Sequence, residues 1–322
     1  PKALTPWPAD APRDRLGLAR WLTAPENPLA GRVAVNHLWQ MLFGQGLVRT
    51  SEDFGLQGER PSHPELLDWL AVDLVKHGWD LKRTLKFIVM SRTYRQDSAV
   101  SAALLAKDPE NRLLARGARF RLPSWMIRDG ALRSAGLFNP VLGGPPVRPY
   151  QPDGVWEELF MGRFKYEASE GPAQYRRTLY AFWRRSIAPT FLFDSAQRRS
   201  CEVRTGRTNT PLQALTLQND ATYLESSQAI AAELLREGGD ATRIQSLFRR
   251  VLSREANDQE AALLGRTLMK ARAHYRAQPA AAGQFLRVGQ RVRADGAGLS
   301  ELAAWTVVAS LTLNLDEAIT HE

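Results

Sequence analysis

Cysteine is nearly absent from this chain, in which Cys201 is the only one. A single thiol excludes an internal disulfide framework, a multi-cysteine zinc site and the paired-cysteine motif that attaches c-type haem. Only five histidines are present, so a zinc site built from histidines alone is not expected either. The sequence therefore predicts neither a metal nor a cofactor within this segment.

Long apolar runs and familiar catalytic motifs are also missing. No stretch of eighteen apolar residues occurs, which argues against a membrane span. The chain has no HExxH, P-loop, dinucleotide-binding glycine motif or GxSxG. Asp53-Phe54-Gly55 matches a kinase tripeptide, but no HRD or glycine-rich nucleotide loop accompanies it. The sequence leaves open whether the chain is an enzyme.

What is present is a basic composition with a normal apolar share. Apolar residues make up 44% and charged residues 24%, values typical of a globular protein. Lysine and arginine outnumber aspartate and glutamate by 43 to 34, a net charge of +9, which permits nucleic acid, anionic glycans or acidic proteins as partners. The chain begins without methionine and is rich in proline at its start, so we expect residues 1–13 to be a linker from a longer polypeptide.

Apolar residues recur at helical spacing over most of the chain, including a final helix over 299–313. We therefore predict a mainly α, multi-helix bundle-like domain over 14–322, with at most a small β-hairpin, placed around 162–166. A segment rich in proline and glycine, 140–150, interrupts the pattern. It would join two sub-lobes over 14–139 and 151–322.

The segment from Arg49 to Leu70 holds the densest group of unusual residues. Ser62 and Glu65 have the spacing of a capping box, which predicts a helix start. In the helix that follows, apolar residues share one face: Leu67, Leu70, Ala71 and Leu74. The opposite face holds carboxylates beside an indole. The candidate catalytic residues are Asp53, His63, Glu65 and Asp68, and the candidate ligand-binding residues are Gln57 and Trp69. The alternative is that the acids only complement the helix dipole.

The most basic part of the chain runs from Arg176 to Arg207, where arginines alternate with aromatic residues. This pattern suits phosphate or sulfate groups and makes the stretch a candidate polyanion or nucleic-acid site. Arginine also packs inside helical proteins, so a structural role stays open. A helix is expected over 174–186.

A second capping box follows, formed by Thr210 and Gln213. The candidate ligand-binding residues near it are Arg204, Asn209 and Asn219. Asn219 falls on the apolar face of the expected helix, where bonding to a neighbouring backbone group is the simpler interpretation.

Several blocks in a fixed order resemble a known family. They read VNHLWQMLFGQGLVRTSEDFGLQGERPSHPELLDWLA, GWDLKRTLKFIVMSRTYRQ, DPENRLLARGARFRL, RTGRTNTPLQALTLQND and ELAAWTVVASLTLNLDEAITHE. From about Asp14 to its end the chain resembles the planctomycete cytochrome-associated C-terminal domain, domain of unknown function 1553. The resemblance implies a module of a large exported protein, periplasmic or extracellular, with c-type haem in a companion domain. It supplies no catalytic residues.

Three functional hypotheses follow. The first is an accessory binding or scaffold domain, linked to glycan use or electron transfer, whose partners are other domains of the same polypeptide and a polysaccharide or another polyanion. The second is an enzyme, as a hydrolase or oxidoreductase component, with an acidic and histidine site near Asp53 to Asp68. The third is polyanion or nucleic-acid binding through Arg176 to Arg207.

Overall fold

The chain folds into two compact units. Unit 1 comprises residues 1–120, 202–204 and 321–322, and unit 2 comprises residues 121–201 and 205–320. The computed structural model describes residues 4–184, 187–196, 203, 206–290 and 298–321. Residues 140–150, which the sequence predicts to join two sub-lobes, lie inside unit 2.

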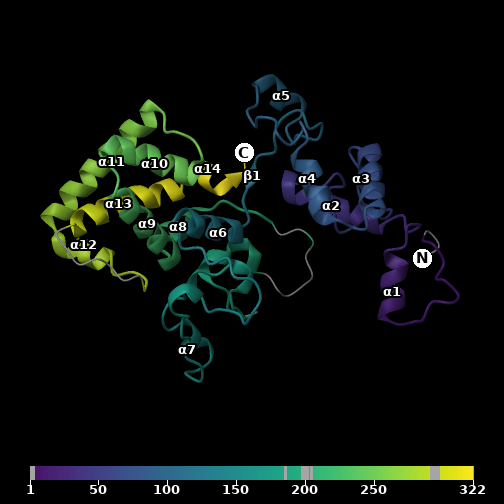
Figure 1. The fold of residues 1–322 in the computed structure, drawn as a ribbon, viewed down its shortest axis with the longest axis horizontal. Coiled ribbons are helices and arrows are strands. Elements are labelled where there is room, and N and C mark those ends of the chain that lie inside the picture. The colour runs from purple at the N-terminus through teal and green to yellow at the C-terminus, as the bar shows by residue number, and fades with distance from the viewer. Residues whose placement is uncertain (1–3, 185–186, 197–202, 204–205, 291–297, 322) are drawn as a thin grey trace. The chain divides into compact units, whose positions relative to one another are not determined.

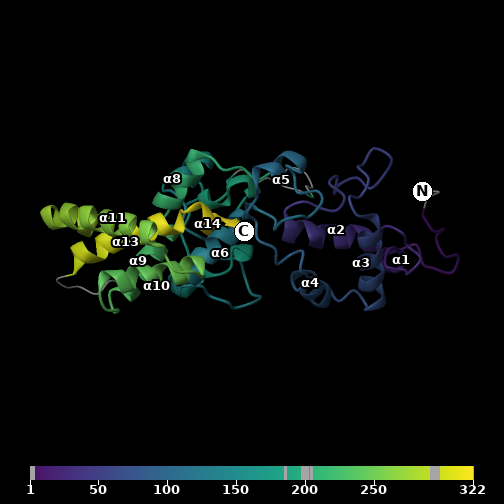
Figure 2. The same ribbon diagram turned by 90° about the horizontal axis from the view of Figure 1, so that it is seen from above.

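Helices make up most of the regular structure, which confirms the mainly α prediction (Figures 1 and 2). Within the described residues, the one sheet is a pair of two-residue strands, β1 (Phe120–Arg121) and β2 (Thr320–His321). No strand forms around residues 162–166. That segment follows α7 (Val155–Leu159) without regular structure, and its Tyr166 ring packs 5.0 Å from the buried Trp156 ring. None of the described helices is long and apolar enough to cross a membrane.

Unit 1 is built on three helices that contact one another. Its helices are α1 (Arg15–Leu22), α2 (Ala30–Phe43), α3 (Pro64–Lys76), α4 (Leu81–Val89) and α5 (Ala102–Lys107). Helices α2, α3 and α4 pack together around a core that includes Val35, Leu70 and Ile88. The predicted apolar face of α3 is buried along its length, so its periodicity identified the core side correctly.

The start of α3 corrects the prediction of a capping box at Ser62. The helix begins at Pro64, His63 is the N-cap residue, and no side chain caps it. A cap at Ser62 would require helical backbone angles at His63. Proline disfavours those angles in the residue before it, and His63 has φ −136° and ψ 81°. The Ser62 hydroxyl instead lies 3.4 Å from the carbonyl oxygen of Leu47.

The second predicted cap is confirmed at Thr210, whose hydroxyl accepts a hydrogen bond from the backbone amide of Gln213 at 3.3 Å. The reciprocal half of the predicted capping box is not found, because the Gln213 side chain donates to the Thr208 hydroxyl instead. Thr210→Ala is therefore expected to lower the free energy of unfolding by about 0.5–2 kcal/mol. Ser62→Ala is the control and should change it by less than about 0.5 kcal/mol. Urea denaturation of both variants is the measurement. If both variants lost the same free energy of unfolding, the lost cap at Thr210 would not explain the destabilisation.

In unit 2, several helices pack on one long helix, α13 (Leu299–Leu313). Unit 2 holds α6 (Ser124–Ser134), α7, the 3-10 helices η1 (Gly171–Tyr175), η2 (Thr178–Tyr180) and η3 (Thr190–Ala196), then α8 (Pro211–Asn219), α9 (Ala221–Leu234), α10 (Asp240–Leu252), α11 (Asp258–Ala277), α12 (Pro279–Phe285), α13 and α14 (Asp316–Ile319). Helices α9, α11 and α12 pack on α13, drawn in yellow in Figure 1. Trp305 and Val308 of α13 are fully buried, and the predicted bounds of this helix are confirmed.

The single helix expected over residues 174–186 does not form. Its described part consists of the end of η1, then η2 and irregular segments, while residues 185–186 lie outside the described residues. The buried Arg128 of α6 donates to the carbonyl oxygens of Gln174 at 2.9 Å and Arg176 at 3.0 Å. An α-helix would use those carbonyls for its own hydrogen bonds. In this structure the buried guanidinium takes the place of those helical hydrogen bonds.

Candidate functional site

Helix α8 adjoins two hollows of unit 2. The segment that leads into it, with Gly206 and Arg207, lines a small pocket that we call the Arg121 pocket. Its C-terminal end, with Asn219, lines a larger cleft that we call the Asn219 cleft. In both hollows, side chains of unit 2 can meet a ligand.

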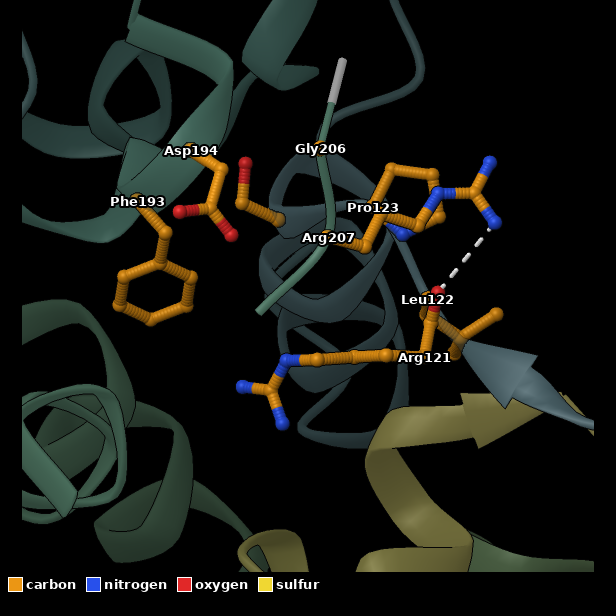
Figure 3. Close-up of a pocket in the computed structure, with 8 residues that line it drawn as sticks. Arg121, Leu122, Pro123, Phe193, Asp194, Gly206 and Arg207 are labelled. Atoms are coloured by element: carbon orange, nitrogen blue, oxygen red, sulfur yellow. Dashed lines mark hydrogen bonds between the residues drawn. The ribbon is translucent and has the colours of Figure 1, made fainter. Parts of the chain in front are cut away.

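The Arg121 pocket has a volume of about 20 Å³, enough for one water-sized group. Figure 3 shows Phe193 and Asp194 on one side of it, the Gly206–Arg207 backbone beside them and the Arg121 side chain extending beneath. Its lining residues are Arg121, Leu122, Pro123, Ser124, Phe193, Asp194, Gly206 and Arg207. Two arginines and one aspartate therefore set its charge.

Asp194 is held in place by the segment before α8. Its carboxylate accepts hydrogen bonds from the Thr208 amide at 2.7 Å and from the Thr208 hydroxyl at 2.9 Å. The buried Gln213 side chain donates to that hydroxyl at 2.9 Å. Phe193, directly before Asp194, has φ 44° and ψ −124°, angles that a residue with a side chain rarely adopts. Strain of this kind persists only where surrounding contacts enforce it.

Among the described residues, the Arg121 side chain is anchored through Nη1. Its Nη1 donates to the Asn209 side-chain oxygen at 2.8 Å, and its guanidinium carbon lies 5.9 Å from the centre of the Phe193 ring. Its Nη2 is buried and has no hydrogen-bond partner among the residues that the structure describes. Burial lowers the pKa of Arg121, because the charged form loses hydration, while the nearby Asp194 acts in the opposite direction.

The Asn219 cleft has a volume of about 530 Å³. It is lined by Tyr150, Gln151, Pro152, Thr190, Leu215, Thr216, Asn219, Asp220 and Ala221. Asp220 caps α9 by accepting from the Thr222 amide at 2.9 Å, and it also accepts from the Thr190 hydroxyl at 2.5 Å. The Asn219 amide donates to the carbonyl oxygen of Leu215 at 2.8 Å. The Asn219 side chain is exposed, so the face of α8 on which the sequence placed it is not a core face. Its ligand-binding role stays a prediction.

One wall of the cleft rests on a buried carboxylate. Tyr150 is hydrogen-bonded to Glu225, which is fully buried, and burial together with this negative charge raises the pKa of Tyr150 well above its ordinary value. Glu225 also accepts from the Gln290 amide at 2.6 Å and from the Tyr175 hydroxyl at 3.3 Å. Glu225 therefore ties the cleft wall to the turn that follows α12.

The predicted acidic residues of unit 1 have separate partners. Asp53 accepts from the Gly55 amide at 2.6 Å, as in an aspartate turn, and His63 Nδ1 lies 3.0 Å from the Ser62 hydroxyl. Asp68 forms an ion pair with Arg32 at 2.6 Å, and this hydrogen bond lowers the pKa of the carboxyl. Glu65 is exposed. Within the described ranges, no hydrogen bond or ion pair joins any two of these four residues, and their catalytic role stays a prediction.

The predicted ligand-binding residues are also dispersed. Trp69 is 50% exposed and its ring lies 5.1 Å from that of Phe87, while Gln57 is exposed in the turn before α3. Asn209 binds Arg121 and Asn219 lines the cleft. Arg204 lies outside the described residues. Only the two asparagines adjoin a hollow described above.

Sequence reasoning missed the residues that shape the hollows. Arg121 and Tyr150 lie far from α8 in the sequence, and no spacing rule connects them with it. Glu225 lies on α9, the helix directly after α8, but no motif marks it. Asp194 offered a weak signal as one of the few acids in the basic stretch. Among the described residues, no group of three or more His, Cys, Asp or Glu could hold a metal ion.

Comparison with known proteins identifies the family. The model of the PSD1 family, described as "Protein of unknown function (DUF1553)", matches residues 14–268, more than half of the chain. Both hollows are lined by residues within this range. Neither a curated protein nor a solved structure matches the chain.

Proposed function

We propose that the chain, which belongs to the DUF1553 family, is a non-enzymatic binding module that holds a sugar unit in the Asn219 cleft. The observation that carries the proposal is the cleft itself. A cavity of about 530 Å³ with mostly apolar walls and a few polar groups is the usual form of a small-molecule site.

The lining suits a neutral ligand with hydroxyl groups. Pro152, Leu215 and the Tyr150 ring offer apolar surface to the C–H face of a sugar. Asn219 uses one amide proton for the Leu215 carbonyl, which leaves its other proton and its oxygen for hydroxyl groups. The Asp220 carboxylate already accepts two hydrogen bonds and is the one charged side chain in the lining, which disfavours an anionic ligand.

The proposed context is a large exported protein of the cytochrome-associated kind. In such a protein this module would hold a polysaccharide end while other domains of the same polypeptide act on it or transfer electrons. The resemblance of the sequence blocks supports this context. The absence of recognised catalytic motifs supports a binding role.

The two rival functions receive less support. An enzyme site around Asp53 would need at least two of its groups in one pocket, whereas Asp53 and Asp68 each have their own partner. For polyanion binding, Arg176 is buried, and its guanidinium lies 3.9 Å from the Tyr180 ring centre. It also donates to the Pro145 carbonyl at 3.0 Å, so it serves the fold. Arg185, Arg198, Arg199 and Arg204 lie outside the described residues.

Isothermal titration calorimetry with a panel of neutral monosaccharides and oligosaccharides tests the proposal. We expect at least one sugar to bind, and Asn219→Ala to weaken its binding about three- to tenfold, the effect of one or two lost hydrogen bonds. Gln218→Ala is the matched control, because Gln218 is an exposed amide on the same helix outside the cleft lining. Absence of binding to the whole panel, or equal effects of the two variants, would contradict the proposal.

A further inference from the structure

We propose that the Arg121 pocket is a second, separate site, which binds one oxyanion group, a carboxylate, sulfate or phosphate, through the guanidinium of Arg121. The proposal does not depend on sugar binding in the Asn219 cleft. Four features of the pocket carry it: a free donor, the net charge, backbone strain and size.

The free donor is Arg121 Nη2. Because Nη1 is fixed to the Asn209 oxygen, the guanidinium plane is oriented before any ligand arrives. Arg121 lines the pocket, and its Nη2 is buried and has no hydrogen-bond partner in the described part of the chain. Buried donors are almost always satisfied in folded proteins, so an unsatisfied one beside a cavity indicates a missing acceptor. A planar guanidinium prefers the oxygens of carboxylate, sulfate and phosphate groups.

The net charge of the lining favours an anion. Arg121 and Arg207 carry positive charge, and Asp194 is the one acid among the lining residues. The carboxylate of Asp194 is directed at the Thr208 amide and hydroxyl, which satisfy both of its oxygens. The lining therefore holds more basic than acidic side chains. Burial of the Arg121 guanidinium strengthens its interaction with an anion, since less water competes for it.

Strain and size restrict what the pocket accepts. The unfavourable backbone at Phe193 positions both its ring, near the Arg121 guanidinium, and the neighbouring Asp194. Strain held by surrounding contacts is typical of pre-organised binding sites. A volume of about 20 Å³ admits the terminal oxygens of a group and not a whole ring. The pocket therefore has room for a terminal oxygen of an oxyanion, and the rest of the ion or ligand would lie outside it.

Calorimetric titrations of the full chain with sodium sulfate, phosphate and acetate test the site, with sodium chloride matching the ionic strength. We expect at least one oxyanion to bind wild type, and Arg121→Gln to weaken that binding about tenfold or more. Arg121→Lys, which keeps the charge and loses the fork, should fall between them. The preferred oxyanion distinguishes a planar from a tetrahedral group.

The matched control is Arg133→Gln, since Arg133 is an exposed arginine of α6 outside the pocket, and it should bind as wild type does. If Arg121→Gln fails to fold, Asn209→Ala replaces it, because it releases the exposed anchor of Nη1 and should weaken binding several-fold. Absence of oxyanion binding to wild type would overturn the proposal. The proposal would also be overturned if Arg121→Gln bound the oxyanion as tightly as wild type. Where Asn209→Ala is used instead, equal binding by that variant and wild type would overturn it.

Discussion

Arg128→Met is expected to lower the free energy of unfolding by about 3–5 kcal/mol. Arg128 is 1% exposed, and its guanidinium lies 4.8 Å from the centre of the Phe191 ring. Its donors satisfy the carbonyl oxygens of Gln174 and Arg176, and Nη1 also reaches the Thr178 hydroxyl at 3.2 Å. Methionine fills a similar volume but donates nothing, so these acceptors would be left unpaired in the interior.

Urea denaturation monitored by circular dichroism measures this loss. Arg133→Met is the control, because Arg133 is an exposed arginine on the same helix, and its change should stay within about 0.5 kcal/mol. Similar losses in both variants would show that any apolar residue on α6 is harmful. Near-wild-type stability of Arg128→Met would mean that residues 174–178 keep their course without the buried guanidinium.

The helices could be predicted from sequence because their signals are local. The apolar face of α3 and the bounds of α13 follow from spacing within one segment, and the structure confirms both. The cap at Thr210 is equally local and is found as predicted. The predicted cap at Ser62 was wrong, and the reason is also local. Pro64 disfavours helical backbone angles at His63, and this outweighs the capping pattern.

The course of residues 174–186 could not be predicted because its cause lies elsewhere in the chain. Its residues are acceptable in a helix, and nothing in their spacing announces that Arg128, about fifty positions earlier, binds two of their carbonyl groups. A tertiary contact of this kind overrides local propensity. At Arg176, the alternation of arginine and aromatic residues serves the fold, because the Arg176 guanidinium packs on the Tyr180 ring.

The candidate sites were only partly accessible to sequence reasoning. The polar residues around α8 drew attention to Asn209 and Asn219, which adjoin the two hollows. Arg121 and Tyr150, which complete them, come from distant segments and carry no motif. The strained backbone at Phe193 has no signature either, because phenylalanine is not a residue that predicts positive φ.

Gly289→Ala is expected to cost about 2–4 kcal/mol of unfolding free energy. Gly289 has φ +89°, a conformation that alanine adopts only with strain. A Cβ at this position would lie 2.2 Å from the Glu225 side chain, and Glu225 is fully buried with little room to move. The clash falls on the carboxylate that holds Tyr150, so sugar binding in the Asn219 cleft should weaken as well.

Gly283→Ala is the control for the Gly289→Ala variant. It shows whether any glycine-to-alanine change in the segment after α11 lowers stability. Gly283 lies within α12, and a Cβ there would meet nothing within 4 Å, so alanine should raise stability by about 0.5–1 kcal/mol. Thermal denaturation of both variants, followed by sugar titration at a temperature where both are folded, gives the two readouts. If Gly289→Ala lost stability but kept full sugar affinity, Glu225 would brace the fold without positioning the cleft wall. If Gly289→Ala kept both its stability and its sugar affinity, the turn at Gly289 could move away from Glu225 without cost. The close approach of this turn to Glu225 would then not stabilise the folded state.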